Sequence, residues 1–429
     1  MAKGILRFIL KILAKLILAR YKPEVIGVTG SVGKTGAKEA IFTVLSSKFN
    51  VRQSLKNYNN EIGLPLTIIG AQSPGKFILG WCAVIVKAIL MILIKEKEYP
   101  RILVAELAVD KPGDMGYLIN IVKCKVGVVT AIGHSHLEFF GSIEKIKKEK
   151  ELLIKRGLTE NGWAVLNYDD EKTRAMREET GARVLTFGFS EQAEVSAREL
   201  KSISNIKNKD FGVNFKLIFK GSAVPVFLPK VISEITVQAA LTAGAVAIIY
   251  GFNLIEIGSA LKNFKSPPGR LSLIDGIKGT LIMDDTYNSS PQSSIAALKT
   301  AENIFLERGA RKIAVLGDML ELGSYTEEGH REIGRQVAMS GADVLMTVGE
   351  RARDIGRGAR EAGMNADNIF HFSDVGEAGL FLQDKMREGD LILIKGSQGM
   401  RMEKIVKEIM ADPLRAEELL VRQGKEWEK

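Results

Sequence analysis

Short apolar runs alternate with amphipathic stretches along most of the chain, and this alternation predicts an α/β fold. Residues 24–30 form one such run, and the apolar positions of residues 37–49 behind it have the spacing of a helix. Repetition of this unit indicates a mostly parallel sheet with helices packed on it. The predicted buried strands of the first part of the chain are residues 24–30, 101–109, 125–133 and 162–170.

The pattern changes twice further along the chain. Residues 190–230 read as antiparallel strands that elaborate the first domain, and a helix of small residues follows them. Ser-Pro-Pro-Gly-Arg at residues 266–270 then interrupts the pattern, and a second α/β series begins. We therefore predict a central P-loop ATPase domain at residues 23–265 and a C-terminal, Rossmann-like α/β domain at residues 266–429.

Residues 1–22 predict a cationic amphipathic helix. Arg7, Lys11 and Lys15 lie four residues apart and form one stripe, while aliphatic residues occupy most of the remaining positions. Residues 4–20 are too short and too charged to span a bilayer comfortably, so we expect them to lie on a membrane surface. The alternative is a helix packed on the protein's own core.

A second apolar run, residues 77–94, is long enough to raise the question of a membrane span, although Lys87 interrupts it. A single crossing here would place Lys34 and Glu106 on opposite sides of the membrane. If these two residues share one site, the run lies on the surface beside the first helix or inside the protein.

Composition narrows the classes of function. Residues 1–22 carry six of the nine net positive charges, and the rest of the chain is nearly balanced, so no nucleic-acid groove is predicted. Cys82 and Cys124 lack the spacing of a metal or redox site, which favours a reduced, cytoplasmic location.

A glycine-rich loop between the first predicted strand and helix indicates a phosphate site. Its glycines let the backbone wrap around phosphate oxygens, Lys34 supplies a positive charge, and the Thr35 hydroxyl can hold Mg²⁺. The strict P-loop pattern would need a glycine in place of Val28, so a structural turn is the alternative. The predicted nucleotide-binding loop consists of Gly30, Ser31, Val32, Gly33, Lys34, Thr35 and Gly36.

The loop without its first glycine resembles that of the Mur ligases, ATP-dependent amide-bond-forming enzymes of cell-wall synthesis. The resemblance runs from about residue 24 to the end of the chain, and its last motifs are most similar to the member that adds D-alanyl-D-alanine to a muramoyl-tripeptide. The similar segments, in chain order, are NYNNEIGLPLT (57–67), VAELAVDKPGDM (104–115), TAIGHSHLEFFGSIEKIKKEKELL (130–153), PPGR (267–270), DDTYNSSPQSS (284–294), LGDMLELG (316–323) and IKGSQGMRME (394–403).

The resemblance implies a catalytic and metal-binding set around ATP. Lys34 and Thr35 would bind the phosphates and a first Mg²⁺, and Glu106 and His136 would hold metal ions between the γ-phosphate and the acceptor carboxylate. Lys150 corresponds to the lysine that the family carbamylates to bind a second Mg²⁺, with Lys148 as the fallback. The alternatives are a paired buried Glu106, a surface His136, and lysines that are solvated helix charges.

Further residues would surround the nucleotide by the same resemblance. Asn59 and Asn60, with Thr67 in the same motif, would shape the nucleotide and acceptor pocket. Of the C-terminal positions, Arg270 would lie near the phosphates, Asn288 near the base and Asp318 near the ribose. Each could instead be a cap or turn residue. Lys395 and Arg401 suit anion contacts, and His330 is a weaker candidate.

The implied function is ATP-dependent ligation with Mg²⁺, joining D-alanyl-D-alanine to a muramoyl-peptide carboxylate through an acyl phosphate. Two alternatives stay open: a ligase of the same family acting on a folate-type or poly-amino-acid substrate, and a non-catalytic ATP-binding protein at the membrane. Contact with a membrane surface would involve residues 4–20 and 77–94.

Four departures from the family pattern affect this expectation. Gly36 replaces a hydroxyl residue of the loop, Ile235-Thr236 replaces a His-Asn pair at the adenine pocket, and Gln398 stands where close relatives usually have arginine. Only about 22 residues precede the first strand, where the family normally has a domain that grips the UDP end of the acceptor. A membrane-held acceptor fits this last departure.

Overall fold

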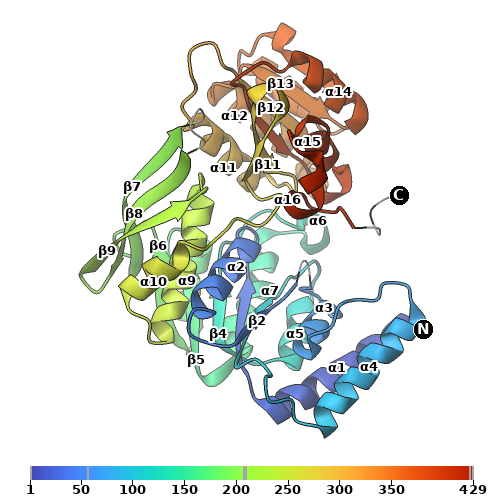
Figure 1. The fold of residues 1–429 in the computed structure, drawn as a ribbon, viewed down its shortest axis with the longest axis vertical. Coiled ribbons are helices and arrows are strands. Elements are labelled where there is room, and N and C mark those ends of the chain that lie inside the picture. The colour runs from blue at the N-terminus through green and yellow to red at the C-terminus, as the bar shows by residue number, and fades with distance from the viewer. Residues whose placement is uncertain (1, 56–57, 206–209, 425–426, 428–429) are drawn as a thin grey trace.

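A computed structural model describes residues 2–55, 58–205, 210–424 and 427. Two sheets, each with helices packed against it, form two bodies that meet across a shared cavity (Figure 1). The predicted α/β fold class is confirmed.

The first sheet has nine strands in the order β2-β3-β1-β4-β5-β6-β7-β8-β9. The strands from β2 to β7 run parallel, whereas β7, β8 and β9 pair antiparallel. Their bounds are β1 Glu24–Thr29, β2 Val51–Gln53, β3 Ile102–Glu106, β4 Cys124–Val129, β5 Leu158–Asn167, β6 Arg183–Gly188, β7 Val195–Asn205, β8 Asp210–Phe219 and β9 Ser222–Pro229.

Apolar side chains on both faces of this sheet explain the continuous apolar runs of its parallel strands. On one face, Ile26 and Val28 of β1 pack with α2 Lys34–Leu45, α9 Glu234–Ile249 and α10 Leu254–Leu261. On the other face, Val25 belongs to a cluster with the remaining helices. These are α1 Ala2–Tyr21, α3 Gly63–Ile69, α4 Ile78–Leu93, α5 Asp114–Ile121, α6 Leu137–Phe140, α7 Ile143–Arg156 and, at the far edge, α8 Glu171–Ala175.

The second sheet has six strands in the order β10-β11-β15-β12-β13-β14, all parallel except β10. Their bounds are β10 Ser272–Asp275, β11 Leu281–Asp285, β12 Lys312–Gly317, β13 Val344–Val348, β14 Ile369–Phe372 and β15 Leu391–Lys395. The helices packed on it are α11 Pro291–Glu302, α12 Thr326–Met339, α13 Arg353–Glu361, α14 Val375–Lys385, α15 Glu403–Ile409 and α16 Ala416–Leu419. The 3₁₀ helices of the chain are Met176–Glu179, Ile277–Gly279, Gly323–Tyr325, Ala366–Asn368, Gln398–Met400 and Pro413–Arg415.

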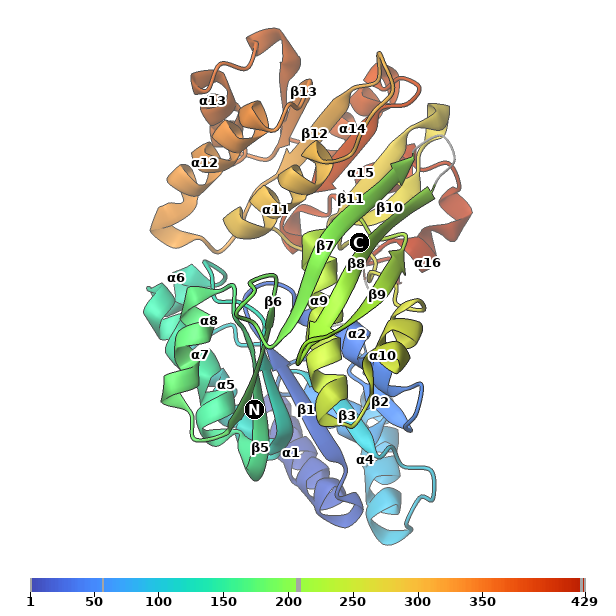
Figure 2. The same ribbon diagram turned by 90° about the vertical axis from the view of Figure 1, so that its left-hand side faces the viewer.

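The antiparallel strands form an arm between the two sheets (Figure 2). Phe211 of β8 is buried in the same apolar cluster as Leu271 and Met283 of the C-terminal body. The chain passes from the first body to the second between α10 and β10, and this segment contains the Pro-Pro-Gly-Arg motif. The arm therefore packs against the C-terminal body through an apolar contact.

One face of α1 is part of the protein core. This agrees with the alternative prediction of a helix packed on the protein's own core. Leu10, Ala14 and Ile17 are fully buried against the central domain, and α1 lies beside α4. In the part of the chain that the structure describes, no helix combines the length and apolarity that a membrane crossing requires.

Candidate active site

A cavity of about 540 Å³ separates the central and C-terminal bodies. It lies beyond the carboxyl ends of β1 and β3, where the strand order reverses direction, which is where open α/β sheets bind ligands. Of the predicted site residues, those that line the cavity are Ser31, Val32, Gly33, Lys34, Gly36, Asn59, Asn60, Glu106, His136, Arg270, Asn288 and Lys395.

The loop from Gly30 to Gly33 has the backbone of an anion site. Gly30 and Gly33 have φ angles of 147° and 86°, which favour glycine. A Cβ atom at Gly30 would also lie only 2.0 Å from the Thr130 hydroxyl oxygen. Because Gly33 has no side chain to cap α2, the first backbone N–H groups of that helix remain available to a phosphate.

Lys34 points back over this loop. Its amino group donates a 2.8 Å hydrogen bond to the Gly30 carbonyl. Burial lowers the pKa of Lys34, the nearby positive charge of Arg270 lowers it further, and Glu106 opposes both effects. Two cations face one carboxylate here, so a polyphosphate would relieve the repulsion between them.

Glu106 ends β3 with its side chain buried in the site. Thr35 donates a 2.9 Å hydrogen bond to one carboxylate oxygen, and Asn59 donates a 3.1 Å bond to the other. Burial alone would raise the pKa of Glu106, but Lys34, Arg270 and Asn59 together hold it below its ordinary value. Glu106 is therefore an anion at neutral pH and lies next to the predicted phosphate loop.

His136 connects the two bodies. Its Nδ1 lies 2.7 Å from Oε2 of Glu321 in the C-terminal body, and its Nε2 lies 3.5 Å from Oδ1 of Asp110 in the central body. The same segment is tied to the phosphate loop, because Ser31 Oγ accepts a 2.9 Å hydrogen bond from the Gly133 N–H. Glu321 in turn has its pKa lowered by the hydrogen bond with His136.

Lys150 is buried on α7, whereas the fallback Lys148 is exposed. Burial lowers the pKa of Lys150 well below its ordinary value, and Lys34 adds to the effect. The amine is thus biased towards its neutral, nucleophilic form.

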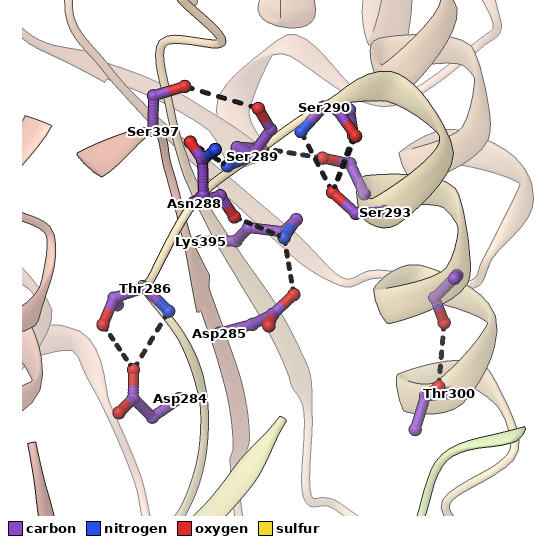
Figure 3. Close-up of polar contacts among 12 residues, drawn as sticks. Asp284, Asp285, Thr286, Asn288, Ser289, Ser290, Ser293, Thr300, Lys395 and Ser397 are labelled. Atoms are coloured by element: carbon purple, nitrogen blue, oxygen red, sulfur yellow. Dashed lines mark hydrogen bonds and ion pairs between the residues drawn. The ribbon is translucent and has the colours of Figure 1, made fainter. Parts of the chain in front are cut away.

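The C-terminal wall of the cavity is built at the carboxyl ends of β11 and β15 (Figure 3). Lys395 forms a buried 2.6 Å ion pair with Asp285 and donates a 2.9 Å bond to the Asn288 carbonyl. Arg270 stacks over the Tyr287 ring at 4.1 Å, and its buried Nε has no partner among the described residues. Such an unsatisfied donor fits an anionic ligand.

Other predicted site residues have structural contacts instead. The Asp318 carboxylate accepts a 2.7 Å bond from the Ala352 N–H and does not line the cavity. Arg401 pairs with Glu403 at 2.6 Å. Thr67 donates to the Gly63 carbonyl within α3. His330 is fully buried, donates from Nδ1 to the Thr326 carbonyl and accepts the Met319 N–H at Nε2.

Comparison with known proteins gives the family. Residues 86–247 match the Mur ligase middle domain, and residues 269–398 match the Mur ligase glutamate ligase domain. A UDP-N-acetylmuramoyl-tripeptide–D-alanyl-D-alanine ligase of Bacillus subtilis is 31% identical over 94% of this chain and 79% of its own length. The chain is a Mur ligase. The enzyme of the same name from Escherichia coli is 29% identical to this Mur ligase over 92% of the chain and 78% of the relative.

Solved structures agree with this membership. A structure of MurF from Acinetobacter baumannii aligns with this Mur ligase at a TM-score of 0.77 and 27% identity, covering 95% of this chain and 81% of the other. A MurF ligase from Thermotoga maritima, solved in complex with ADP, aligns at a TM-score of 0.75 and 27% identity, covering 93% and 82%.

The structure adds residues to this Mur ligase site that were not singled out from the sequence. Asp110, Glu321 and Tyr287 all line the cavity. Asp110 and Glu321 lie inside motifs quoted for the resemblance, and a carboxylate four residues after Glu106 at a strand end was a usable signal for Asp110. The pairing of Glu321 with His136 had no signal, because 185 positions separate the two residues.

The positions at which this Mur ligase departs from the family pattern also lie on the cavity. Gly36, Ile235, Thr236 and Gln398 are all part of its lining. A Cβ atom at Gly36 would make an ordinary 3.5 Å contact with the Ala239 Cβ, so space does not require glycine there. The departures therefore alter the ligand pocket directly.

Proposed function

We propose that this Mur ligase joins D-alanyl-D-alanine, or a closely related amine, to the terminal carboxylate of a muramoyl peptide while ATP is converted to ADP and phosphate. The observation that carries the proposal is the hydrogen bond from Thr35 to Glu106, because it joins a phosphate loop to a buried anion at the edge of one cavity. The named activity of the relatives from B. subtilis and E. coli supplies the substrate class.

The chain's own residues account for the binding of ATP. The N–H groups at the start of α2 and the Lys34 ammonium surround the β- and γ-phosphates, and Arg270 approaches from the C-terminal body. Asn288 and the segment at Ile235-Thr236 line the part of the cavity assigned to the base. The proposed contact of Asp318 with the ribose rests only on the resemblance to the family motif, because Asp318 does not line the cavity.

The residues present fit Mg²⁺ as well as ATP. Glu106, His136 and the Thr35 hydroxyl are the predicted ligands, and the described residues contain no cluster of three or more His, Cys, Asp or Glu side chains suited to a metal. This sparse set suits Mg²⁺, which takes one or two protein carboxylates and fills its other positions with phosphate oxygens and water. When bound, the cation neutralises charge between the triphosphate and the acceptor carboxylate.

Lys150 completes the proposed set. A buried amine whose pKa lies well below its ordinary value can add carbon dioxide and release a proton, which leaves a carbamate anion. Lys34 repels the charged form of this amine but would attract the carbamate anion, so the modified group would gain a favourable charge interaction at this buried position.

In this reaction the protein mainly has to position the substrates, and no side chain is needed as a general acid or base. An acceptor carboxylate oxygen attacks the γ-phosphorus, and ADP leaves. The amine nitrogen next attacks the acyl-phosphate carbon, phosphate leaves and the amine proton passes to solvent. Lys34 stabilises the transferred phosphoryl group, and the contact of His136 with Glu321 holds the two bodies together so that water is kept from the acyl phosphate.

The decisive experiment measures phosphate release by the purified chain with a panel of acceptors and amines. We expect release only when ATP, a muramoyl peptide and D-alanyl-D-alanine are all present, and none from Lys34→Ala. If the enzyme prefers a folate-type or poly-amino-acid acceptor and its amine, the proposed substrate class is wrong, but the proposed ATP-dependent ligation still holds. ATP binding without release under any pair would contradict the proposal as a whole.

A further inference from the structure

Helix α1 exposes an apolar stripe to solvent. Its members are spaced three or four residues apart, and Phe8 has 64% of its surface exposed. They lie on the side of the helix opposite its buried residues, so the core cannot cover them. The stripe consists of Ile5, Phe8, Ile12 and Leu16.

Helix α4 repeats this arrangement beside α1. Its inner residues Val84, Ala88 and Met91 are buried, and an exposed apolar stripe occupies the opposite side. Helices α1 and α4 lie side by side (Figure 1), and a 2.9 Å hydrogen bond from the Tyr21 hydroxyl to the Met91 carbonyl joins their carboxyl ends. Both helices bury their inner side in the same apolar cluster, so we treat the two exposed stripes as one surface. We call this surface the apolar face; its α4 members are Leu79, Val86, Leu90 and Leu93.

The two helices of the apolar face and the segment before α4 carry only positive charge, and Glu61, an acid at the border of the face, is paired with Arg7. Residues 1–22 and 71–95 contain nine Lys and Arg residues and no Asp or Glu, while the formal net charge of the whole chain is +9. The rest of the protein is therefore neutral in sum. Arg7 and Lys11 stack on Tyr117, beside the exposed stripe, so their charges lie at the edge of the face.

The face can meet a membrane only by lying flat on it. Both helices have one side packed in the core, so neither can turn or insert across a bilayer without unfolding the central domain. Apolar side chains bordered by cations fit the boundary between acyl chains and anionic headgroups. A second copy of the chain would place the cations of one helix pair against those of another, which argues against self-association.

The apolar face also adjoins the active-site cavity. Arg7 lies 3.4 Å from Glu61, which follows the cavity-lining Asn60 in the sequence. A bilayer on the face would therefore lie on the side of the cavity formed by the Asn59-Asn60 loop. An acceptor held in the membrane could reach the site from there.

We propose that the apolar face binds the surface of an anionic phospholipid bilayer, so that the ligase works on an acceptor presented at the membrane. The second clause rests on the proposed function, whereas bilayer binding does not.

The test is flotation of the full chain with phosphatidylcholine vesicles, with and without phosphatidylglycerol. We expect binding only to the vesicles that contain phosphatidylglycerol, and release by high salt. The triple variant Phe8→Ser, Ile12→Ser, Leu90→Ser should reduce the vesicle-bound fraction at least about tenfold, because three apolar side chains lose their contact with lipid. All three positions are exposed, so the variant should keep its melting temperature.

The matched control is Phe305→Ser, which removes an even more exposed aromatic residue from the C-terminal body and should leave vesicle binding unchanged. Three outcomes would overturn the proposal: no binding of the original chain to either vesicle, equal loss in the control, or an original chain that sediments as a dimer which the triple variant abolishes. Failure of the ligase assay with intact vesicle binding would reject only the proposed function. Equal turnover of a soluble acceptor by the original chain and the triple variant would agree with bilayer binding, because the substituted residues lie outside the active-site cavity.

Discussion

At the residue scale, Glu106 has the most specific environment in the cavity. A buried carboxylate is stable only with partners, and here a hydroxyl, an amide and two cations supply them. The hydrogen bond from Thr35 could be accepted by the side-chain oxygen of a glutamine at position 106 as well as by the Glu106 carboxylate. The charge, and not the hydrogen bond, is therefore what distinguishes a functional role from a structural one.

Glu106→Gln separates these roles because it keeps the size of the side chain and removes its charge. We expect kcat to fall about 10²–10³-fold, the range seen when one group that stabilises transition-state charge is lost. ATP affinity should stay or improve, since an anion near the phosphates is gone. Steady-state kinetics with titration calorimetry would check this, and a kcat within a few-fold of the original would assign Glu106 to structure alone.

Asp284 offers a second test at this scale, away from the proposed chemistry. It is fully buried, and burial raises its pKa to about 6 although Thr286 donates to it through both its N–H and its hydroxyl. The native state therefore holds this proton more tightly than the unfolded chain does. Ionisation of Asp284 costs stability as the pH rises from about 4 to 6.

Asp284→Asn keeps both acceptor bonds and removes the titration. When the pH is raised from below 4 to above 6, the free energy of unfolding of the original chain should fall by roughly 3 kcal/mol relative to that of the variant. Denaturant melts of both proteins across this pH range would measure the difference. Parallel pH profiles would show that Asp284 has the same pKa in both states.

At the element scale, α2 carries the least expected residue of the phosphate loop. Gly36 lies in its first turn, where glycine is less favourable than alanine by about 0.5–1 kcal/mol and where the neighbouring Ala239 leaves room for a side chain. The glycine therefore lowers the stability of α2 without a steric reason.

Substitution of Gly36 separates helix stability from phosphate binding. Both Gly36→Ala and Gly36→Ser should stabilise the central domain, alanine by about 0.5–1 kcal/mol. Only the serine adds a hydroxyl near the phosphates, so only Gly36→Ser should bind ATP more tightly. Thermal melts and nucleotide titrations would check both expectations, and tighter binding by the alanine variant would trace the effect to the helix instead.

The elements themselves show what an apolar pattern can and cannot predict. The run at 101–109 predicted a strand, yet β3 ends at Glu106. The Leu107 N–H still bonds to Val28 of β1, but the residues up to Val109 are apolar because they are buried beyond the end of the strand. β14, four half-buried residues at the sheet edge, produced no recognisable run. Most buried parallel strands were predictable, although β6 was not singled out from the sequence. The ends of the strands and the edge strands depend on packing partners far away in the sequence.

At the scale of the whole molecule, the site is complete only when the two bodies meet. Motif order predicted that the phosphate loop, Glu106 and Arg270 would converge, and all of them border one cavity. The contacts that close it were not predictable, because they join loops of different bodies. They include the pair of His136 with Glu321 and the stacking of His134 on Tyr325 at 5.1 Å. The Glu138 N–H also donates a 3.2 Å hydrogen bond to the Glu321 carbonyl.

Glu321→Ala tests whether these contacts hold the bodies together. A partly exposed ion pair of this kind contributes about 0.5–1 kcal/mol, so its loss should lower the closed-to-open ratio about two- to fivefold. We expect a larger radius of gyration in solution scattering for the variant without ligand and a smaller difference with a non-hydrolysable ATP analogue, which would add contacts across the cavity. Because Glu321 has a lowered pKa, the original chain should approach the variant as the pH falls and that carboxylate is protonated. Identical scattering of both proteins at every pH would mean that the arm at Phe211 alone sets the distance between the bodies.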